Sequence, residues 1–223
     1  MKISIIHASR SRASIAHQTA SKWLSLASAP SLIEYIICLD LSDPKGIEYA
    51  QYFSHSKYKK CIKDNKSAIE AFNEGAKMST GDLIIAISDD FSCEPYWDIR
   101  LEKDIWDKED FILKTRDGIQ KTLITLPLMD RKYYDRFGYI YNPIYKHLWC
   151  DTEMTVVAHY LGRVINSTMV FEHLHHSTGK NVRDSISKKN DATHVQGKKV
   201  FNERLKKNFG IKSPLVKYSD ISW

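Results

Sequence analysis

Short apolar runs alternate, in the amino-terminal part of the chain, with segments in which apolar side chains recur every three or four positions. A continuous apolar run is typical of a strand buried on both faces, and the longer period is typical of an amphipathic helix. The expected strands are Lys2–His7, Glu34–Leu39, Tyr58–Ile62 and Leu83–Ile87, and the expected helices are Ile15–Ala27 and Lys66–Met78. This alternation predicts an α/β fold whose sheet is mainly parallel and flanked by helices.

The remainder of the chain continues the alternation less regularly. Its patterns predict helices over Tyr96–Ile105, Thr152–Leu161 and Asp191–Asn208, and strands over Lys121–Leu128 and Val164–Phe171. We therefore expect a single domain over residues 1–176 and an extension over residues 177–223 that packs on it.

Charge is distributed unevenly between these two parts. The 223-residue chain has a net charge of +6, but from Ser177 onward 11 Lys and Arg stand against 4 Asp and Glu, a net of +7. The extension is therefore expected to be basic and helical. Such a segment is typical either of a solvated lysine-rich helix or of a surface that binds polyanions, such as nucleic acid, phosphorylated glycans or anionic lipid.

The cysteines and the apolar runs indicate where in the cell the protein is expected. Cys38, Cys61, Cys93 and Cys150 lack the spacing of a zinc site, so we expect buried thiols in a reducing compartment, and hence a cytoplasmic protein. No apolar run reaches the roughly 20 residues that span a bilayer, and the amino terminus lacks a signal-peptide core. We expect no transmembrane segment, and the sequence predicts no oligomeric state.

Two adjacent carboxylates, Asp89 and Asp90, follow the strand Leu83–Ile87 after a single residue, Ser88. In open α/β sheets ligands bind at the carboxyl ends of strands, so these acids are expected at a ligand site. Paired carboxylates there favour a hard divalent cation that also carries phosphate oxygens. The chain contains neither G-x-G-x-x-G nor G-x-x-x-x-G-K, so no dinucleotide-binding turn and no P-loop is available to hold phosphates.

Other acidic and histidine side chains stand at the ends of further expected elements. Asp40 ends the second strand, where turn formation is the alternative to ligand binding. Asp151 and Glu153 stand at the start of a helix, where stabilisation of the helix dipole is the alternative. His173 and His175 follow the last strand and share one face of an extended segment, because side chains alternate there.

Four segments together resemble glycosyltransferase family 2, whose members have the GT-A fold. FNEGAKMSTGDLIIAISDDF (72–91) is similar to the family's N-x-G helix and the DXD-type strand that follows it. WCDTE (149–153) resembles the E-D pair, with a cysteine in the place of the glutamate, FEHLHH (171–176) the late histidine segment, and IIHASRSR (5–12) the opening strand and turn. The resemblance implies one Rossmann-like GT-A domain, with the nucleotide-sugar side over about residues 1–92 and the acceptor side over about 93–176.

The resemblance also implies which residues bind a nucleotide-diphosphate sugar. They are His7, Ser9, Arg10, Arg12, Asp40, Asn73, Asp89 and Asp90. Within this set Asp40 is expected at the nucleobase. Because Ser88 stands where the D-x-D motif has its first carboxylate, we expect Asp90 to bind the metal and Asp89 to contact ribose or support the site. The implied metal is Mn²⁺ or Mg²⁺, with His173 or His175 as a further ligand.

The expected reaction moves a hexosyl or pentosyl group from this donor to an acceptor hydroxyl, with inversion in a single displacement. The resemblance places Asp151 as the base that takes the acceptor's proton, with Glu153 as the substitute. A base in this role typically raises the reaction rate about 10²–10⁴-fold. The expected acceptor is a glycan or, because the carboxyl-terminal segment is basic, a hydroxymethylated base in DNA.

Two other functions stay open at this stage. The first is a nucleotidyltransferase of similar fold, which normally has a glycine-rich basic loop after its first strand, whereas residues 8–14 contain no glycine. The second is a module that binds a nucleotide sugar without turning it over.

Overall fold

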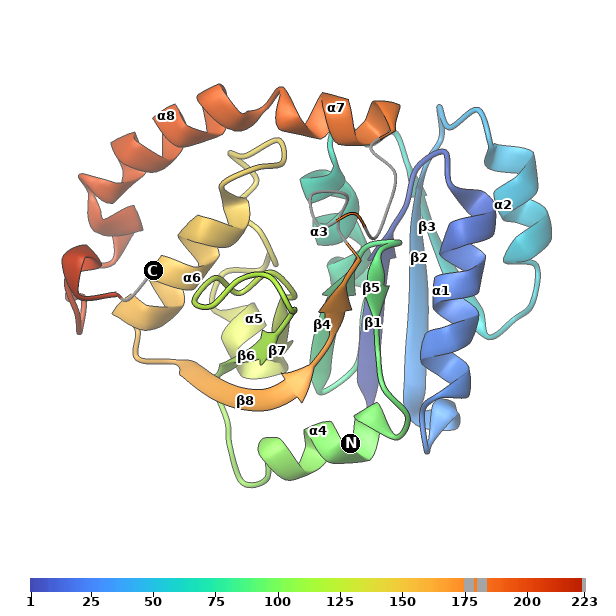
Figure 1. Cartoon of the computed structure of the whole chain (residues 1–223), viewed down its shortest axis with the longest axis horizontal. Coiled ribbons are helices and arrows are strands. Elements are labelled where there is room, and N and C mark those ends of the chain that lie inside the picture. Colours follow the sequence, from blue (N-terminus) through green and yellow to red (C-terminus); the bar gives the residue numbers. More distant parts are fainter. Residues whose placement is uncertain (175–178, 180–183, 222–223) are drawn as a thin grey trace.

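The computed structural model describes residues 1–174, 179 and 184–221. Within these residues the central feature is a seven-stranded sheet with the strand order β3-β2-β1-β4-β7-β6-β8 (Figure 1). Its strands are β1 (Ile3–Ala8), β2 (Ile33–Asp40), β3 (Tyr58–Lys63), β4 (Leu83–Ile87), β6 (Ile112–Arg116), β7 (Leu128–Asp130) and β8 (Val164–Val170). Strands β3, β2, β1 and β4 pair in parallel, whereas β7 is antiparallel to both β4 and β6. The expected α/β fold with a mainly parallel sheet is confirmed.

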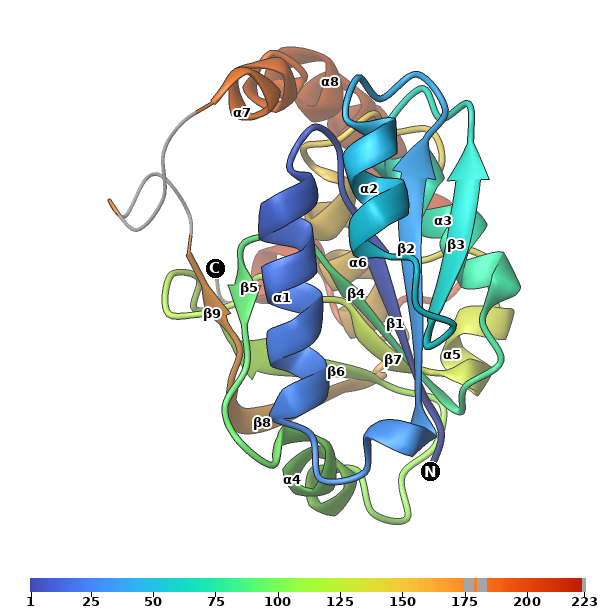
Figure 2. The ribbon, with the colours of Figure 1, turned by 90° about the vertical axis from the view of Figure 1, so that its right-hand side faces the viewer.

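Helices cover both faces of the sheet, which is why its central strand β4 is apolar along its whole length. The helices are α1 (Ala13–Ser25), α2 (Gly46–Tyr52), α3 (Ala68–Met78), α4 (Trp97–Asp104), α5 (Arg131–Asp135), α6 (Cys150–Tyr160), α7 (Ser185–Asp191) and α8 (His194–Leu205), with 3₁₀ turns at Pro30–Leu32, Asn208–Gly210 and Tyr218–Asp220. Alternate side chains of β4 serve two cores: Ile85 packs in the core of Trp23 from α1, and Ile84 in the core of Phe72 from α3. Figure 2 shows α1 and α2 in front of the sheet.

A second, two-stranded sheet joins the segment after β4 to the segment after β8. Strand β5 (Phe91–Ser92) pairs antiparallel with β9 (Glu172–His173), so that Phe91 lies opposite His173. The residue before β9, Phe171, is fully buried and stacks on Trp23 with ring centroids 5.2 Å apart. This packing places the late histidine segment beside the carboxyl end of β4.

The carboxyl-terminal helices α7 and α8 lie along one side of the molecule, at the top of Figure 1. Phe201 of α8 is buried in the same core as α6, with its ring 5.2 Å from that of Trp149. Gly197 permits this close approach, because a Cβ at this position would lie only 2.4 Å from the carbonyl oxygen of Leu148. Among the described residues, no helix combines the length and the apolar character that crossing a membrane requires.

The structure corrects several expected elements. Residues 121–127 form no strand: Ile124 donates its amide to Thr155 Oγ1 (3.0 Å), and Pro127 has no amide to donate, so a ladder cannot form there. The strands on either side of this segment are β6, which was not expected, and β7, which shares only Leu128 with the expected strand. The short helices α2 and α5 were not expected either. The expected helix over 191–208 is α8 alone, from His194 to Leu205, and a separate helix, α7, ends at Asp191. Between the two helices, Thr193 turns its hydroxyl to the Leu148 amide and the Asn190 carbonyl.

Candidate active site

The carboxyl ends of the central strands border a cavity of about 560 Å³. Its walls come from the β1–α1 turn, the end of β4, the loop before α6, and the inner side of α7 and α8. Its polar lining includes Arg12, Ser88, Asp90, His147, Asp151, His173 and Asp191. The apolar lining includes Phe72, Leu123, Tyr141 and Trp149. The fold therefore gathers residues from both ends of the chain around one space.

Asp90 and His173 meet at this cavity because of the β5–β9 ladder. The Leu174 amide donates to the Asp90 carbonyl (2.8 Å), and His173 Nε2 lies 3.3 Å from Asp90 Oδ2. Ser88 donates its hydroxyl to Asp90 Oδ1. Burial alone would raise the pKa of Asp90, but His173 and Ser88 outweigh it and lower the pKa to about 2. Asp90 is therefore ionised throughout the physiological range.

Asp89 turns away from the cavity, into the protein. Its Oδ1 lies 2.9 Å from Nε2 of the fully buried His7, whose Nδ1 lies 2.7 Å from the Tyr35 hydroxyl. Burial, with a further contribution from Asp89, raises the pKa of Tyr35 well above its ordinary value, so that its hydroxyl stays protonated and donates to His7. With Nδ1 accepting from Tyr35, the Nε2–H of His7 donates to Asp89. The two adjacent aspartates thus have different surroundings.

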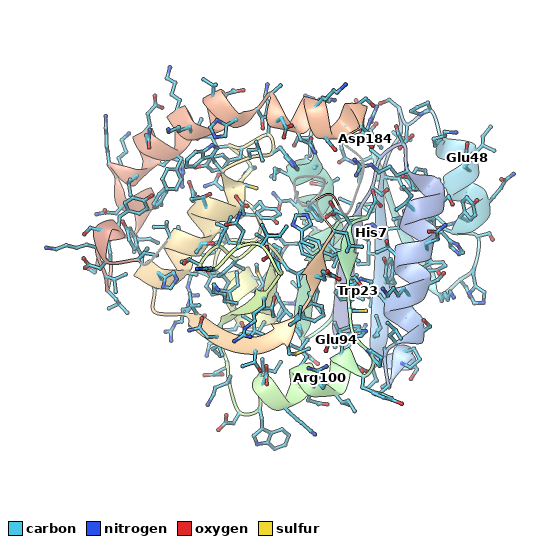
Figure 3. The ribbon with its side chains drawn as sticks, viewed as in Figure 1. His7, Trp23, Glu48, Glu94, Arg100 and Asp184 are labelled. Atoms are coloured by element: carbon cyan, nitrogen blue, oxygen red, sulfur yellow. The ribbon has the colours of Figure 1, made fainter. Side chains whose placement is uncertain are left out.

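Arg12 lines the cavity and connects it to the carboxyl-terminal helices. Its Nε and Nη2 donate to the two carboxylate oxygens of Asp184, both at 2.8 Å, and its Nη1 lies 3.6 Å from Asp89 Oδ2. Asp184 caps α7 by accepting the Ser187 amide (2.8 Å). The hydrogen bonds from Arg12 hold the pKa of Asp184 well below its usual range. Figure 3 shows Asp184 at the start of α7.

Ser9, Arg10 and Asp40 form a separate polar group at the carboxyl ends of β1 and β2, outside the cavity lining. Arg10 Nη1 lies 2.7 Å from Asp40 Oδ2, and the Ser42 amide donates to Asp40 Oδ1 (2.8 Å). Burial would raise the pKa of Asp40, but the bonds from Ser42 and Arg10 lower it. The Ser9 hydroxyl lies 2.6 Å from the Tyr49 hydroxyl.

Asn73 of α3 holds the cavity wall in place. Its side-chain amide donates to the Tyr141 carbonyl (2.7 Å), and its oxygen accepts from the backbone amides of Ile140 (3.0 Å) and Tyr141 (3.2 Å). The neighbouring side chain, Phe72, lines the cavity together with Tyr141. Asn73 itself is buried.

Asp151 lies in the first turn of α6 and lines the cavity. The helix begins at Cys150, one residue before this acid, and not after it. Its Oδ1 accepts the amide of Thr152 (2.8 Å), while Oδ2 takes no hydrogen bond from any described residue. Burial raises the pKa of Asp151 above its ordinary value, although the bond from Thr152 opposes this. A partly buried carboxylate with one open oxygen suits the acceptance of a proton.

Glu153, on the same helix, is placed elsewhere. It is 3% exposed and forms a bidentate pair with Arg204 of α8, with N–O distances of 2.6 and 2.8 Å. Asn142 Nδ2 and the Tyr145 hydroxyl also donate to it, each at 2.8 Å. The bonds from Arg204 tie α6 to α8, those from Asn142 and Tyr145 tie α6 to the loop before it, and the Glu153 side chain does not line the cavity that holds Asp151.

Comparison with known proteins identifies the family. The family model described as glycosyl transferase family 2 matches residues 12–165. The chain belongs to glycosyl transferase family 2. A search of curated proteins found no match.

Solved structures of similar fold include other glycosyltransferases. The mannosyltransferase PcManGT from Pyrobaculum calidifontis, in complex with GDP-Man and Mn²⁺, aligns with a TM-score of 0.60 at 11% identity, over 77% of this chain and 56% of that one. S. aureus TarS 1-349 aligns with a TM-score of 0.63 at 11% identity, over 77% and 59%. The same fragment in complex with UDP-GlcNAc gives 0.62. These likenesses establish the GT-A fold, and the chain spans little more than half the length of these structures.

Among the residues described for this family 2 protein, no cluster of three or more His, Cys, Asp or Glu side chains could enclose a metal. Asp90 and His173 are two candidate ligands on one side of the cavity. Mg²⁺ and related ions are typically held by one or two carboxylates together with phosphates and water, so this donor set fits such an ion. His175, the alternative ligand, lies outside the described residues.

Several side chains of the site were not among the sequence candidates, and two of them bear on its chemistry. His147 lines the cavity, and Asp184 binds Arg12. Asp184 carries a recognisable signal, an acid just before a helix, as helix caps have. His147 lies in a loop, where no periodicity indicates the direction of a side chain.

We predict that the Glu153–Arg204 pair stabilises the fold. Arg204→Met leaves the Glu153 carboxylate buried without its partner charge, which should reduce the free energy of unfolding by about 3–5 kcal/mol. The measurement is urea denaturation followed by circular dichroism. Arg100→Met is the matched control, since the Arg100–Glu94 pair is exposed and should be worth at most about 1 kcal/mol. Equal losses in the two variants would contradict the prediction.

Proposed function

We propose that this chain is a metal-dependent glycosyltransferase that moves a sugar from a nucleotide-diphosphate sugar to an acceptor hydroxyl. The observation that carries the proposal is that Asp90, His173 and Asp151 line the same cavity. Similar structures were solved with GDP-Man and Mn²⁺ and with UDP-GlcNAc, which supports a donor of this class. Family membership favours glycosyl transfer over the transfer of a nucleotidyl group.

In this proposal the donor occupies the half of the site built by residues 1–92. Asp90 and, from outside this range, His173 would hold Mn²⁺ or Mg²⁺, and the ion would supply Lewis-acid stabilisation of the charge on the departing diphosphate. Arg12 provides a cation at the same wall of the cavity, and Asp40 with Arg10 contacts the nucleoside at the ends of β1 and β2. Four buried side chains support these groups from the protein interior, as their hydrogen bonds indicate. They are His7, Ser9, Asn73 and Asp89.

The acceptor occupies the half built by residues 93–176. Asp151 takes the proton of the acceptor hydroxyl while the hydroxyl oxygen attacks the anomeric carbon. The bond between that carbon and the diphosphate breaks, the diphosphate leaves with the bonding electrons, and the configuration inverts. Glu153 replaces Asp151 as the base only if its bonds to Arg204, Tyr145 and Asn142 open. The transferred group is a hexose or a pentose.

For the acceptor we propose a glycan or a hydroxymethylated base in DNA. The inner side of α7 and α8 lines the cavity through Ser187, Asn190, Asp191 and His194. The same helices carry Lys188, Lys189, Lys198 and Lys199, so a polyanion bound along them reaches the site. An acceptor base within a duplex would first have to be flipped out. We also propose a cytoplasmic location, which the four free, buried cysteines support.

The donor is tested by thermal shift with a panel of UDP-, GDP- and TDP-sugars, with and without Mn²⁺. A ligand of the folded state raises the melting temperature by mass action, and we expect one sugar nucleotide to do so more strongly when Mn²⁺ is present. Removal of the ion with EDTA, or Asp90→Asn, should abolish the metal-dependent part of this shift. A shift that is the same for Asp90→Asn and the natural chain would overturn the metal assignment.

Asp151→Asn should leave donor binding intact and reduce transfer by about 10²–10⁴-fold. Because only the ionised base accepts a proton, the rate should fall as pH drops through the raised pKa of Asp151, above the ordinary value of about 3.9. The variant should lose this acid limb. Its melting temperature at pH 7 should not decrease, since a raised pKa means that ionised Asp151 costs stability at that pH. Transfer at the natural rate by this variant would exclude Asp151 as the base. Such transfer would also show that the protein is an enzyme and not a module that only binds a nucleotide sugar.

The acceptor class is tested by binding to plain duplex DNA across a range of salt concentrations. If the lysines of α7 and α8 hold a polyanion, affinity should fall steeply as salt rises, because bound phosphates release their counterions. Lys198→Glu with Lys199→Glu should flatten this dependence. Lys108→Glu serves as the control, because it lies in the loop after α4, and Figure 1 shows α4 on the opposite side of the protein from α7 and α8. Absence of binding at low salt would remove DNA and leave the glycan.

A further inference from the structure

His147 is a cavity residue whose ring has no hydrogen-bond partner among the described residues. It lies four residues before Asp151, in the loop that leads to α6, and it lines the same cavity as Asp90 and Asp151. Its Nδ1 is enclosed and has no hydrogen-bond partner, and neither ring nitrogen bonds to any described residue. A polar ring enclosed in this way is costly unless a ligand or water pairs with it.

Three charged side chains that line the same cavity as His147 already have partners. Asp90 accepts from Ser88 and faces His173, Arg12 is bound to Asp184, and Asp151 holds the Thr152 amide through one oxygen. No acceptor or donor near the ring is therefore reserved for it in the described part of the chain.

The charge state of His147 indicates the kind of group it would bind. Burial lowers the pKa of His147 to about 4, and the carboxylates of Asp90 and Asp191 raise it by less than burial lowers it. The ring is therefore neutral near pH 7, with one N–H and one lone pair. A sugar hydroxyl matches this pattern, because it both donates and accepts. A phosphate only accepts, so it would leave the lone pair of the ring without a donor.

The position of His147 indicates which sugar. The carboxylate that acts most strongly on it is that of Asp90, at the proposed diphosphate end of the cavity, and the chain runs from His147 directly to the proposed base, Asp151. A sugar in transfer has to lie between the diphosphate and the base. Trp149, held at a positive φ of 78° between the two residues, turns the chain so that both line the cavity.

We propose that His147 recognises a hydroxyl of the sugar that is being transferred, and so helps to select the donor. This inference rests on the proposed function. It adds a specificity residue to the site, and it assigns to His147 no part in proton transfer.

The test compares binding of bare nucleotides and nucleotide sugars by isothermal titration calorimetry in the presence of Mn²⁺. The probes are UDP, GDP and TDP, with UDP-GlcNAc, GDP-mannose and TDP-glucose. His147→Phe keeps a ring in the cavity but removes both nitrogens, and His147→Gln restores a group that donates and accepts. His159→Ala is the matched control, since His159 on α6 also has an enclosed nitrogen without a partner, Nε2, but does not line the cavity.

For the nucleotide sugar that the natural chain binds, His147→Phe should weaken binding about tenfold, whereas the affinity for the corresponding bare nucleotide should stay within about twofold. His147→Gln should recover part of the loss, and His159→Ala should show none. Deoxy analogues of the sugar locate the hydroxyl: the one contacted by His147 is that whose removal weakens binding to the natural chain but not to His147→Phe.

Equal losses for the bare nucleotide and the nucleotide sugar would show that His147 acts on the diphosphate or on the fold, and would overturn the inference. So would an unchanged affinity for the nucleotide sugar, or an additional loss from every deoxy analogue in His147→Phe. These results leave the proposed function standing, because the natural chain still binds the donor. If the natural chain binds none of the six probes, the proposed donor class fails, and the role of His147 fails with it.

Discussion

The two-residue ladder between β5 and β9 is the interaction on which the candidate site depends. It sets Phe91 opposite His173, and their rings stack with centroids 4.4 Å apart. Asp90 precedes one strand of the ladder, so its carboxylate comes to lie 3.3 Å from the imidazole of a residue far along the chain. So short a ladder has little stability of its own, and its position must be imposed by the packing around it.

That packing comes from the core on the α1 side of the sheet. Phe171 is fully buried, parallel to the ring of Trp23 and beside Trp97, and Trp23 Nε1 donates to the Phe91 carbonyl (3.0 Å). The same indole thus holds both strands of the ladder. Because close-packed interiors transmit small displacements, a change in this aromatic group would move His173 relative to Asp90. The geometry of the proposed metal ligands is in this sense a property of the core.

Two ion pairs connect the carboxyl-terminal helices to this frame. Arg12 binds Asp184 at the start of α7, and Arg204 of α8 binds the buried Glu153. Both arginines are therefore engaged within the protein, and the positive charge that α7 and α8 offer to a partner is carried by their lysines. Each pair holds one of the helices against a residue of the GT-A domain. The pairs therefore explain why α7 and α8 form part of the cavity wall.

Much of the donor side could be predicted from the sequence, because its signals are local. The buried run of β4, the acids after it and the helix α3 follow from patterns within some twenty neighbouring residues. Other features arise only from contacts between distant segments. Asp89 turns to His7 while Asp90 faces the cavity, and Glu153 is bound by Arg204 although one oxygen of Asp151 is open. The loop residue His147 has no hydrogen-bond partner within the part of the chain that the structure describes. In these cases the residue types and their spacing fit each alternative arrangement equally well. Burial and neighbouring charge decide between the arrangements, and only the tertiary structure supplies them.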